Sequence, residues 1–460
     1  MHLPFRSKKA LRSLATVAVV GMAALGLAAC SNGGGAENKA GSATSGSITW
    51  WGWTPTNTDE ANDFIAAFNK EYPNIKVKYK LVGISDYQAT MRPALASNDG
   101  PDVFDLQPGA YVQQFGSYAE DLTPIAKKAL GSDWKSKIST IAVDGLTAKG
   151  KLAALPVGSG YAGSLWVNAG LFSKYNLKPP TTLDEWKNVC KTFKANGVGC
   201  FAQGAAQEGF DQDTLQAISN SIEPGYWTKA SKGDKKWDNP VIVKTLSIWK
   251  DLFDSGIMQE GALGAQQYPD INNDFLTQKY AMVMMGSWYT QYATEDAMTQ
   301  AISAAGVAGA KPFPILPIQF PDVGGKGHKS EMFGDADYGL AVASKSKHLA
   351  AAETFVRWMG TSAKGQQVVA DRLDTTPVLA GVVPDFSSIK FVDAGLQTDP
   401  VNAYLKGTAT ISEPRFALLN ADLENAFLAA AQSVGSGSST PQQAATTLQQ
   451  AADAAKAANG

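Results

Sequence analysis

The spacing of apolar residues in the first part of the chain changes repeatedly between the period of a strand and that of a helix. Apolar side chains recur every three or four positions over 59–72, which predicts a helix that ends at Pro73-Asn74. Apolar residues alternate with lysines over 75–81, which predicts a half-buried strand. The predicted elements in order are a strand at 47–53, a helix at 59–72, a strand at 75–81, a helix at 87–95 and a strand at 102–106. This order favours an α/β fold with a mostly parallel sheet.

Later segments also alternate between predicted strands and predicted helices, and no internal repeat of fixed period is visible. Thr182 and Glu185 form a capping box that opens a helix, and Asn196-Gly197 ends it. The further predicted elements are strands at 151–157, 164–168, 280–285, 311–321 and 338–343, and helices at 182–193, at 349–359 and from Pro441 onward.

The N-terminal residues have the pattern of an export signal rather than of a folded domain. Basic residues precede an apolar stretch at 14–27, which has the length of a signal-peptide core and is short for a membrane span. Leu27-Ala28-Ala29-Cys30 resembles the bacterial lipobox, so we expect a signal peptide at 1–29 and lipidation of Cys30. The Gly/Ser/Ala-rich residues 30–46 then predict a flexible tether.

Composition narrows the possible partners. The chain has 460 residues, a formal net charge of −2 and 44% hydrophobic residues, which suits a globular protein of two or three domains. Because no basic stripe stands out, nucleic acid is not expected as a partner. In an exported chain Cys190 and Cys200 suggest a disulfide, since no further Cys or His lies near them to complete a metal site.

Residues that could belong to cofactor-binding or catalytic motifs lie in segments whose predicted structure does not suit those motifs. Gly158, Gly160 and Gly163 match GxGxxG, but a strand rather than a helix follows them, so a backbone crossing between two lobes explains these glycines better. His328 and His348 lie in solvated contexts, and no Walker loop or HExxH occurs. We expect no catalysis, cofactor or metal. A glycoside-active enzyme stays an alternative, because sequence alone cannot pair carboxylates such as Asp102, Asp105, Asp211, Asp213 and Asp335 in space.

Several stretches, in this order, resemble one family. They are ITWW (48–51), FIAAFNKEYPNIKV (64–77), ASNDGPDVFDL (96–106), GKLAALPVGSGYAGSLWVN (150–168), LKPPTTLDEWKNVCKTFK (177–194), QKYAMVMMGSW (278–288) and YGLAVASKSKHLAAAETFVRWM (338–359). Together they resemble the extracellular solute-binding proteins of bacterial carbohydrate ABC importers, the group that includes maltose-binding proteins.

The resemblance implies a two-lobed periplasmic-binding-protein-like α/β fold, with a hinge of crossover strands and a ligand cleft between the lobes. It assigns residues 47–157 and 312–344 to the first lobe, and residues 158–311 and 345–460 to the second. It also implies a monomer on the extracytoplasmic face of the membrane. The lipid on Cys30 would anchor it there, where it would bind a sugar and deliver it to ABC permease subunits.

Ligand residues are expected where strands end at the cleft. Aromatic rings would cover the C–H face of a sugar, while acids and amides would bind its hydroxyl groups. The expected ligand residues are Trp51, Trp53, Thr54, Gln107, Tyr111, Tyr161, Asp211, Trp288 and Asp335. Trp50 is expected in the core instead. Some relatives carry charged residues directly after the first strand, where this chain has Trp53 and Thr54. Because of this difference, the resemblance does not identify the sugar, and a peptide or polyamine stays an alternative ligand.

Overall fold

The computed structural model describes residues 41–459 except positions 57, 208, 307–308 and 329. The expected signal peptide, Cys30 and most of the expected tether lie outside the described residues. In the part of the chain that is described, none of the helices combines the length and the apolar character that crossing a bilayer requires.

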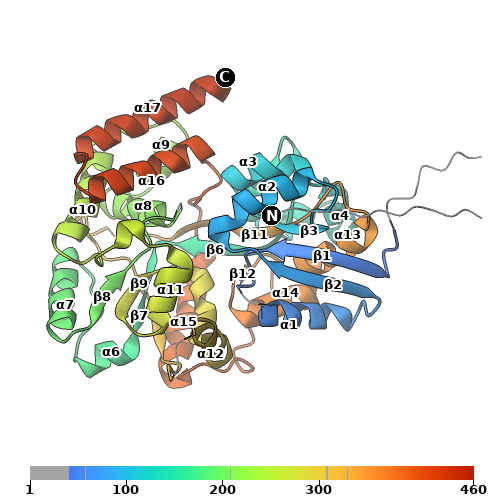
Figure 1. Ribbon diagram of the computed structural model, residues 1–460, viewed down its shortest axis with the longest axis horizontal. Helices are drawn as coiled ribbons and strands as arrows, with labels where there is room; N and C mark the ends of the chain where they lie inside the picture. Colours follow the sequence, from blue (N-terminus) through green and yellow to red (C-terminus); the bar gives the residue numbers. More distant parts are fainter. Residues whose placement is uncertain (1–40, 57, 208, 307–308, 329, 460) are drawn as a thin grey trace, which may run out of the picture. The chain divides into compact units, whose positions relative to one another are not determined.

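The first of the two main sheets has six strands in the order β12-β6-β11-β3-β1-β2. Its strands are β1 (Gly46–Gly52), β2 (Ile75–Leu81), β3 (Val103–Leu106), β6 (Leu155–Ala162), β11 (Phe333–Val342) and β12 (Thr376–Pro377). The helices that pack in its core are α1 (Thr58–Asn69), α2 (Tyr87–Ala96), α3 (Ala110–Phe115), α4 (Thr123–Leu130), α5 (Thr140–Gly145), α13 (Leu349–Thr361) and α14 (Ala363–Arg372). In Figure 1, α1 and α14 lie below β1 and β2, whereas α2 and α3 lie above. A small hairpin, β4 (Thr147–Ala148) with β5 (Lys151–Leu152), completes this first lobe.

The second main sheet has four strands in the order β10-β7-β9-β8. Its strands are β7 (Ser164–Asn168), β8 (Gly199–Ala202), β9 (Tyr280–Met284) and β10 (Ile315–Gln319). Its helices are α6 (Ala169–Lys174), α7 (Leu183–Ala195), α8 (Phe210–Ile222), α9 (Tyr226–Ser231), α10 (Pro240–Asp254), α11 (Asn272–Leu276), α12 (Glu295–Ala304), α15 (Ala394–Thr408), α16 (Ala421–Gly435) and α17 (Pro441–Asn459). Their buried apolar side chains form a second core, which defines the second lobe.

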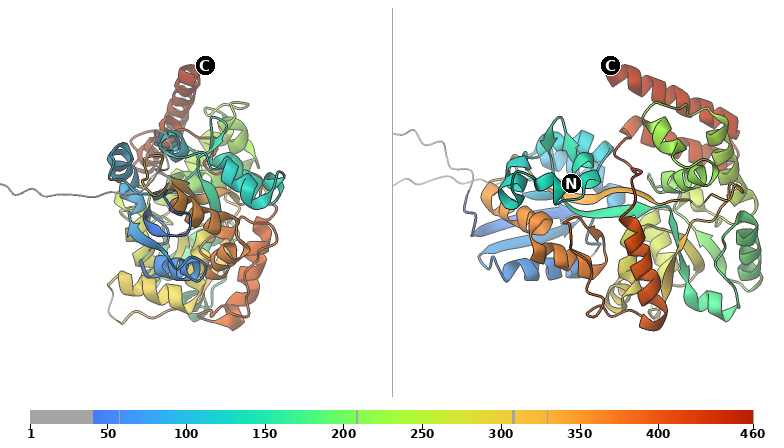
Figure 2. Two further views of the ribbon diagram at one scale, coloured as in Figure 1. Left: turned by 90° about the vertical axis from the view of Figure 1, so that its right-hand side faces the viewer. Right: turned by 180° about the vertical axis from the view of Figure 1, so that it is seen from behind.

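Two long antiparallel strands connect the lobes. Leu155 at the start of β6 belongs to the first core and Ala162 at its end to the second. The paired strand β11 makes the return crossing, from Phe333 in the second core to Ala336 in the first. Figure 2 shows these two strands side by side between the lobes. The GxGxxG residues therefore lie on a crossing strand, as predicted.

The expected lobe boundaries need two corrections. Strand β10 pairs with β7 of the second lobe, so the chain returns to the first lobe only along β11 and not near residue 312. Helices α13 and α14, which were expected in the second lobe, pack in the first core, where Phe355 meets Trp50 with ring centroids 5.6 Å apart. An amphipathic helix shows which of its faces is buried, but its sequence does not show which core it covers.

Most predicted elements are confirmed, with boundaries shifted by a few residues, although strand pairing is more mixed than expected. β1 pairs in parallel with β2 and β3, and β8 pairs in parallel with β9. The other pairs of the two main sheets are antiparallel, namely β11 with β3 and β6, β12 with β6, and β7 with β9 and β10. The Cys190–Cys200 disulfide is formed and links α7 to β8.

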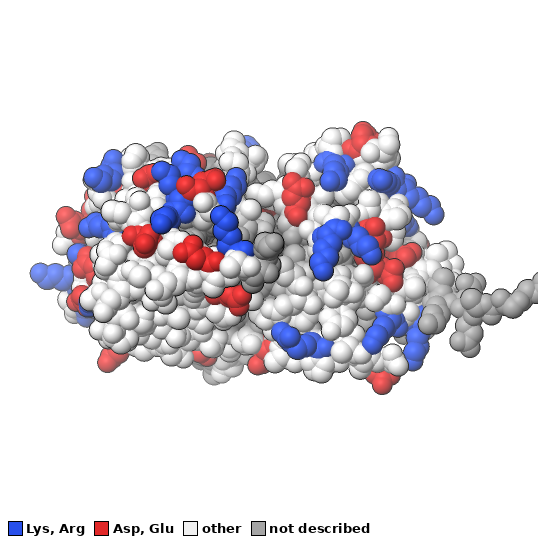
Figure 3. Space-filling view, turned by 90° about the horizontal axis from the view of Figure 1, so that it is seen from above, with Lys and Arg blue, Asp and Glu red and all other residues white. Residues whose placement is uncertain are grey.

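Charged side chains are mixed on the face of the molecule drawn in Figure 3. Lys and Arg side chains alternate with Asp and Glu side chains over both lobes on this face. This face therefore presents no continuous basic surface of the kind that binds nucleic acid.

Candidate functional site

The end of β1 is built around a buried carboxylate, Asp105 of β3. Trp50 points into the first core, where its ring centroid lies 4.6 Å from that of Tyr79. Its indole N–H donates a hydrogen bond to Oδ1 of Asp105 at 2.8 Å. Both Trp50 and Asp105 are fully buried, so the prediction that Trp50 is a core residue is confirmed.

The second oxygen of Asp105 holds the segment that follows the strand. Oδ2 accepts the backbone N–H groups of Trp53 at 2.9 Å and of Thr54 at 3.2 Å. A Cβ atom added to Gly52 would lie only 2.3 Å from this oxygen, so glycine is needed for the carboxylate to approach the chain. Burial raises the pKa of Asp105 well above its ordinary value, while the three N–H donors act in the opposite direction.

Trp53 joins a cluster of three rings in the first lobe. Its ring meets the rings of Tyr87 and Tyr111 edge-on, with centroids 4.8 Å and 5.7 Å away. Tyr87 and Tyr111 stack almost parallel at 5.8 Å, and the hydroxyl of Tyr87 donates to the carbonyl oxygen of Asp105 at 2.7 Å. The structure therefore brings Trp53 and Tyr111, both predicted ligand residues, together and adds Tyr87.

Two other predicted residues are not members of this ring cluster. Trp51 points to the opposite face of β1 from Trp50, and Nζ of Lys80 lies 3.5 Å from its ring centroid. Gln107 follows β3 and is partly buried. Among the hydrogen bonds of the described residues, none joins Gln107 to the three rings. A ligand contact by either residue stays a prediction.

Asp374 links the segment after β1 to the second lobe. The hydroxyl of Thr54 donates to Oδ2 of Asp374 at 3.2 Å, and the amide of Gln291 donates to Oδ1 of the same carboxylate at 2.9 Å. The amide of Gln291 also donates to the carbonyl oxygen of Trp288 at 3.0 Å. Asp374 thus connects the end of β1 with the short 3₁₀ helix η6 (Ser287–Ala293), which carries Trp288.

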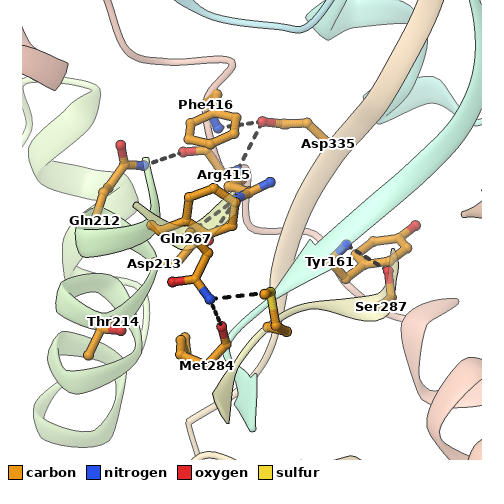
Figure 4. Close-up of polar contacts among 12 residues, drawn as sticks. Tyr161, Gln212, Asp213, Thr214, Gln267, Met284, Ser287, Asp335, Arg415 and Phe416 are labelled. Atoms are coloured by element: carbon orange, nitrogen blue, oxygen red, sulfur yellow. Dashed lines mark hydrogen bonds and ion pairs between the residues drawn. The ribbon is translucent and has the colours of Figure 1, made fainter. Parts of the chain in front are cut away.

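Arg415 is the centre of the second-lobe part of the site (Figure 4). Its Nε and Nη2 atoms donate to the two carboxylate oxygens of Asp213 at 2.7 Å and 2.6 Å, and both side chains are buried. The guanidinium carbon lies 4.5 Å from the ring centroid of Trp288 and 4.2 Å from that of Phe416. One face of Trp288, a predicted ligand residue, is therefore covered by Arg415.

The pair of Arg415 and Asp213 is hard to separate. Removing one partner of a buried ion pair leaves an uncompensated charge, at a cost of about 3–5 kcal/mol. A contact between aromatic rings contributes only about 0.5–1.5 kcal/mol beyond its buried area. Burial raises the pKa of Asp213, but the guanidinium opposes this by favouring the carboxylate. We expect Arg415 to keep its place beside Trp288.

Asp335 holds the backbone that carries Arg415. Its Oδ2 atom accepts the N–H groups of Arg415 at 3.0 Å and of Ala417 at 2.9 Å, and also that of Phe416. Burial raises the pKa of Asp335 to about 6, against the effect of these donors. A predicted ligand residue thus contacts the segment at 413–417, which we call the strap, and its own contact with a ligand stays a prediction.

Tyr161 and Asp211 are the remaining predicted residues. Tyr161 lies on β6, and its backbone N–H donates to Oγ of Ser287 at 3.0 Å, which joins it to the segment that carries Trp288. Asp211 is buried in the first turn of α8, but it is Asp213 of the same turn that pairs with Arg415. From the sequence, Asp213 was only one of several carboxylates whose partners in space could not be predicted.

The glycines of the crossing strand make room for polar side chains of the hinge. A Cβ atom added to Gly158 would lie 2.0 Å from Cγ2 of Thr375, and one added to Gly160 would lie 2.8 Å from Oδ1 of Asp337. Burial and the neighbouring charge of Asp374 raise the pKa of Asp337 to about 7, while Arg415 lowers it. The carboxylates of Asp337 and Asp374 therefore lie close together at the hinge, where Arg415 acts on the first and Arg372 on the second.

Most polar residues of the site could not be predicted from the sequence. Gln291, Asp337, Asp374 and Arg415 stand in no recognised motif. One signal could have found Arg415, because it is one of only four arginines after residue 12 in a chain with many lysines. Arginine is favoured where a planar fork must bind a carboxylate with two bonds, so a rare arginine in a loop suggests such a site.

Two cores, two shared crossing strands and rings at the strand ends of both lobes define a two-lobed binding-protein fold. The family model of the bacterial extracellular solute-binding proteins matches residues 54–367, which is more than half of the chain. The protein belongs to this family, and the resemblance predicted from its sequence is confirmed.

Curated and solved relatives agree with this placement. The chain is 25% identical over 384 residues to the multiple sugar-binding protein of Streptococcus mutans serotype c, which covers 82% of this chain and 85% of that protein. Its fold is similar to that of a chitin oligosaccharide binding protein, with a TM-score of 0.69, 22% identity, and 90% and 99% of the two chains covered. It is also similar to a sugar transporter of Bacillus licheniformis in complex with stachyose, with a TM-score of 0.61, 21% identity, and 88% and 98% covered.

Proposed function

We propose that this protein binds a sugar or oligosaccharide outside the cytoplasmic membrane and delivers it to the permease of an ABC transporter. The observation that supports this most is the combination of rings and polar groups at the ends of both sheets. Trp53 stands with two tyrosines in the first lobe, and Trp288 stands with Arg415 in the second. Rings suit the C–H faces of sugars, whereas carboxylates, amides and guanidinium groups suit their hydroxyls.

Binding in this proposal requires the lobes to separate and close again. Trp53 and Trp288 are each only 8% exposed and Tyr161 is 7% exposed, so a sugar needs an opening to reach these rings. Asp374 follows α14 of the first lobe, so the hydrogen bond that it accepts from Gln291 of the second lobe would break on opening and form again on closure. A ligand that contacts both lobes favours the closed state, because it binds that state more tightly.

Delivery would follow from the location of the protein. Lipidation of Cys30 would hold the folded part at the extracytoplasmic face, and residues 30–46 would give it reach. The closed monomer would then dock on the membrane subunits and release its sugar. We propose no chemical step, since binding proteins of this family act as carriers.

Binding is tested by a panel of sugars. The thermal midpoint is measured with glucose, galactose, maltotriose, xylotriose, chitotriose and stachyose, and positive responses are followed by calorimetry. A sugar that binds only the folded state raises the midpoint, by an amount that grows with concentration above the dissociation constant. No response to any of these sugars would count against the proposal.

A cationic ligand is a second candidate, favoured by the carboxylates at the hinge. Asp337 is partly exposed and lies close enough to Asp374 for their charges to interact. A protonated amine would offset this charge, as in an amino sugar, a polyamine or a basic peptide. Adding glucosamine oligomers, spermidine and a lysine-rich peptide to the same panel separates the two candidates. A response to these compounds alone would favour the second.

A further inference from the structure

The strap lies along α8 as a docked peptide would. The amide of Gln212 donates to the carbonyl oxygen of Arg415 at 2.9 Å, and the amide of Gln216 donates to that of Pro414 at 3.2 Å. One turn further on, the amide of Asn220 donates to the side chain of Glu413 at 3.2 Å. A spacing of four residues places these amides on one face of the helix, so the strap follows that face in register.

The other side of the strap contacts the hinge and the first lobe. The backbone N–H of Gly334 on β11 donates to the carbonyl oxygen of Glu413 at 2.8 Å, next to the three N–H groups that Asp335 accepts. Just beyond the strap, the amide of Gln113 on α3 donates to the carbonyl oxygen of Leu419 at 3.0 Å. The position of Arg415 is therefore fixed by both lobes and the hinge.

We infer that Arg415, and not the ring of Trp288, is the group that the second lobe presents to the sugar, and that Trp288 positions it. This inference rests on the proposed function. The guanidinium covers one face of the Trp288 ring, and moving it away would leave Asp213 buried without a cation. Asp213 takes two of the five N–H donors of the guanidinium, and the others suit neighbouring hydroxyls of a sugar ring.

The strap would then determine which sugars the protein binds, because it carries Arg415. A planar fork binds two adjacent oxygen atoms better than a single one. Arg415 would thus select a sugar ring that carries neighbouring unsubstituted hydroxyl groups. Trp288 would act through Arg415, by stacking under the guanidinium and excluding water from one side of it.

The experiment compares variants by calorimetry with whichever of the six panel sugars binds the wild-type protein most tightly. Arg415→Lys keeps the charge but loses the fork, so we expect binding about 10- to 100-fold weaker. Trp288→Phe keeps a ring under the guanidinium and should stay within about threefold of wild type, whereas Trp288→Leu should be weaker. Arg357→Lys is the matched control, because Arg357 bonds to Tyr72 within the first lobe.

A second measurement distinguishes direct contact between Arg415 and the sugar from a purely structural role of Arg415. The wild-type protein should discriminate about tenfold or more against at least one monodeoxy analogue of that sugar, and Arg415→Lys should lose this discrimination. If Arg415→Lys does not fold, Trp288→Phe and Trp288→Leu are measured with the same analogues. There the inference requires Trp288→Phe to keep the discrimination and Trp288→Leu to lose it.

The outcomes that contradict the inference are distinct from failure of the proposed function. Unchanged or tighter binding by Arg415→Lys would show that the arginine only occupies the place where the sugar stacks, and would overturn the inference. Equal loss of affinity for the sugar and for all its analogues would also overturn it. No binding by the wild-type protein to any panel sugar would refute the proposed function itself.

Discussion

The two lobes hold their parts of the site by different means. In the first lobe, Asp105 organises the end of β1 through N–H donors only, namely the indole of Trp50 and the backbone of Trp53 and Thr54. In the second lobe, Asp213 holds Arg415 through a buried bidentate ion pair. The first arrangement depends on backbone geometry, whereas the second depends on a pair of compensating charges.

This difference predicts different responses to mutation. A carboxylate that accepts N–H groups needs the chain to approach closely, so added volume is the main danger in the first lobe. A buried ion pair needs both partners, so the loss of a charge is the main danger in the second.

Asp213→Ala should lower the free energy of unfolding by about 3–5 kcal/mol, because it leaves Arg415 buried without a counter-charge. Chemical denaturation monitored by circular dichroism measures this change. The matched control is Asp251→Ala, which removes the partner of Lys187 from a more exposed pair and should cost less than about 1 kcal/mol. Similar losses in the two variants would contradict the contrast between the lobes.

Gly52→Ala should lower the free energy of unfolding by about 1–3 kcal/mol, since the new Cβ atom would lie 2.3 Å from Oδ2 of Asp105. It should also weaken sugar binding, because the carboxylate that holds Trp53 and Thr54 is displaced. Gly407→Ala is the control, as nothing lies within 4 Å of its added Cβ atom in α15. If Gly52→Ala is as stable as wild type, the close approach of the Asp105 carboxylate to the backbone does not require glycine at position 52.

Trp53→Ala should weaken sugar binding by about 1–3 kcal/mol, the range expected when a ring wall is lost. Trp51→Ala should have a smaller effect, because that ring lies beside Lys80 and apart from the three-ring cluster. Calorimetry on both variants shows which substitution causes the larger loss of binding free energy. A larger loss for Trp51→Ala would place the sugar beside Trp51 and Lys80 rather than at the three-ring cluster.

Asp337→Asn should change the pH dependence of stability. The pKa of Asp337 is raised from 3.8 to about 7 in the folded protein, so the unfolded chain loses this proton first. The group therefore contributes stability at low pH that is lost as pH rises from about 4 to about 7. Asp337→Asn should flatten this decline and add about 1–2 kcal/mol at pH 8, since solvent screens a partly exposed group.

Urea midpoints at pH 5, 6, 7 and 8 measure this effect. Asp99→Asn is a suitable control, because Asp99 is exposed in the turn before β3. A steeper decline in Asp337→Asn than in wild type would contradict the sign of the prediction.

The sequence predicted the local parts of this molecule better than the distant ones. The strands around Trp50 and the ring at Trp53 could be found because they follow from spacing within a few residues. The capping of α7 was predicted for the same reason, and Thr182 accepts the N–H of Glu185. In contrast, Asp213 and Arg415 are separated by about 200 residues, and no local pattern joins them.

Lobe assignment failed for a related physical reason. Helix α13 has a clear apolar face, but that face alone does not show which of the two cores covers it. Similarly, the GSW motif made Trp288 a predicted ligand residue, whereas its contact with Arg415 depends on the strap, which has no periodic pattern. Local patterns in one sequence do not show which distant segments meet in space, so the contacts between such segments could not be predicted.

The two cores also share an unusual dependence on the C-terminal part of the chain. The first core needs α13 and α14, and the second needs α15, α16 and α17, so a growing chain can complete neither core until most of it has been made. Such long sequence separations slow folding, because distant segments must meet before they stabilise each other. Since the N-terminal residues predict export, slow folding would help the chain to remain unfolded until it has crossed the membrane.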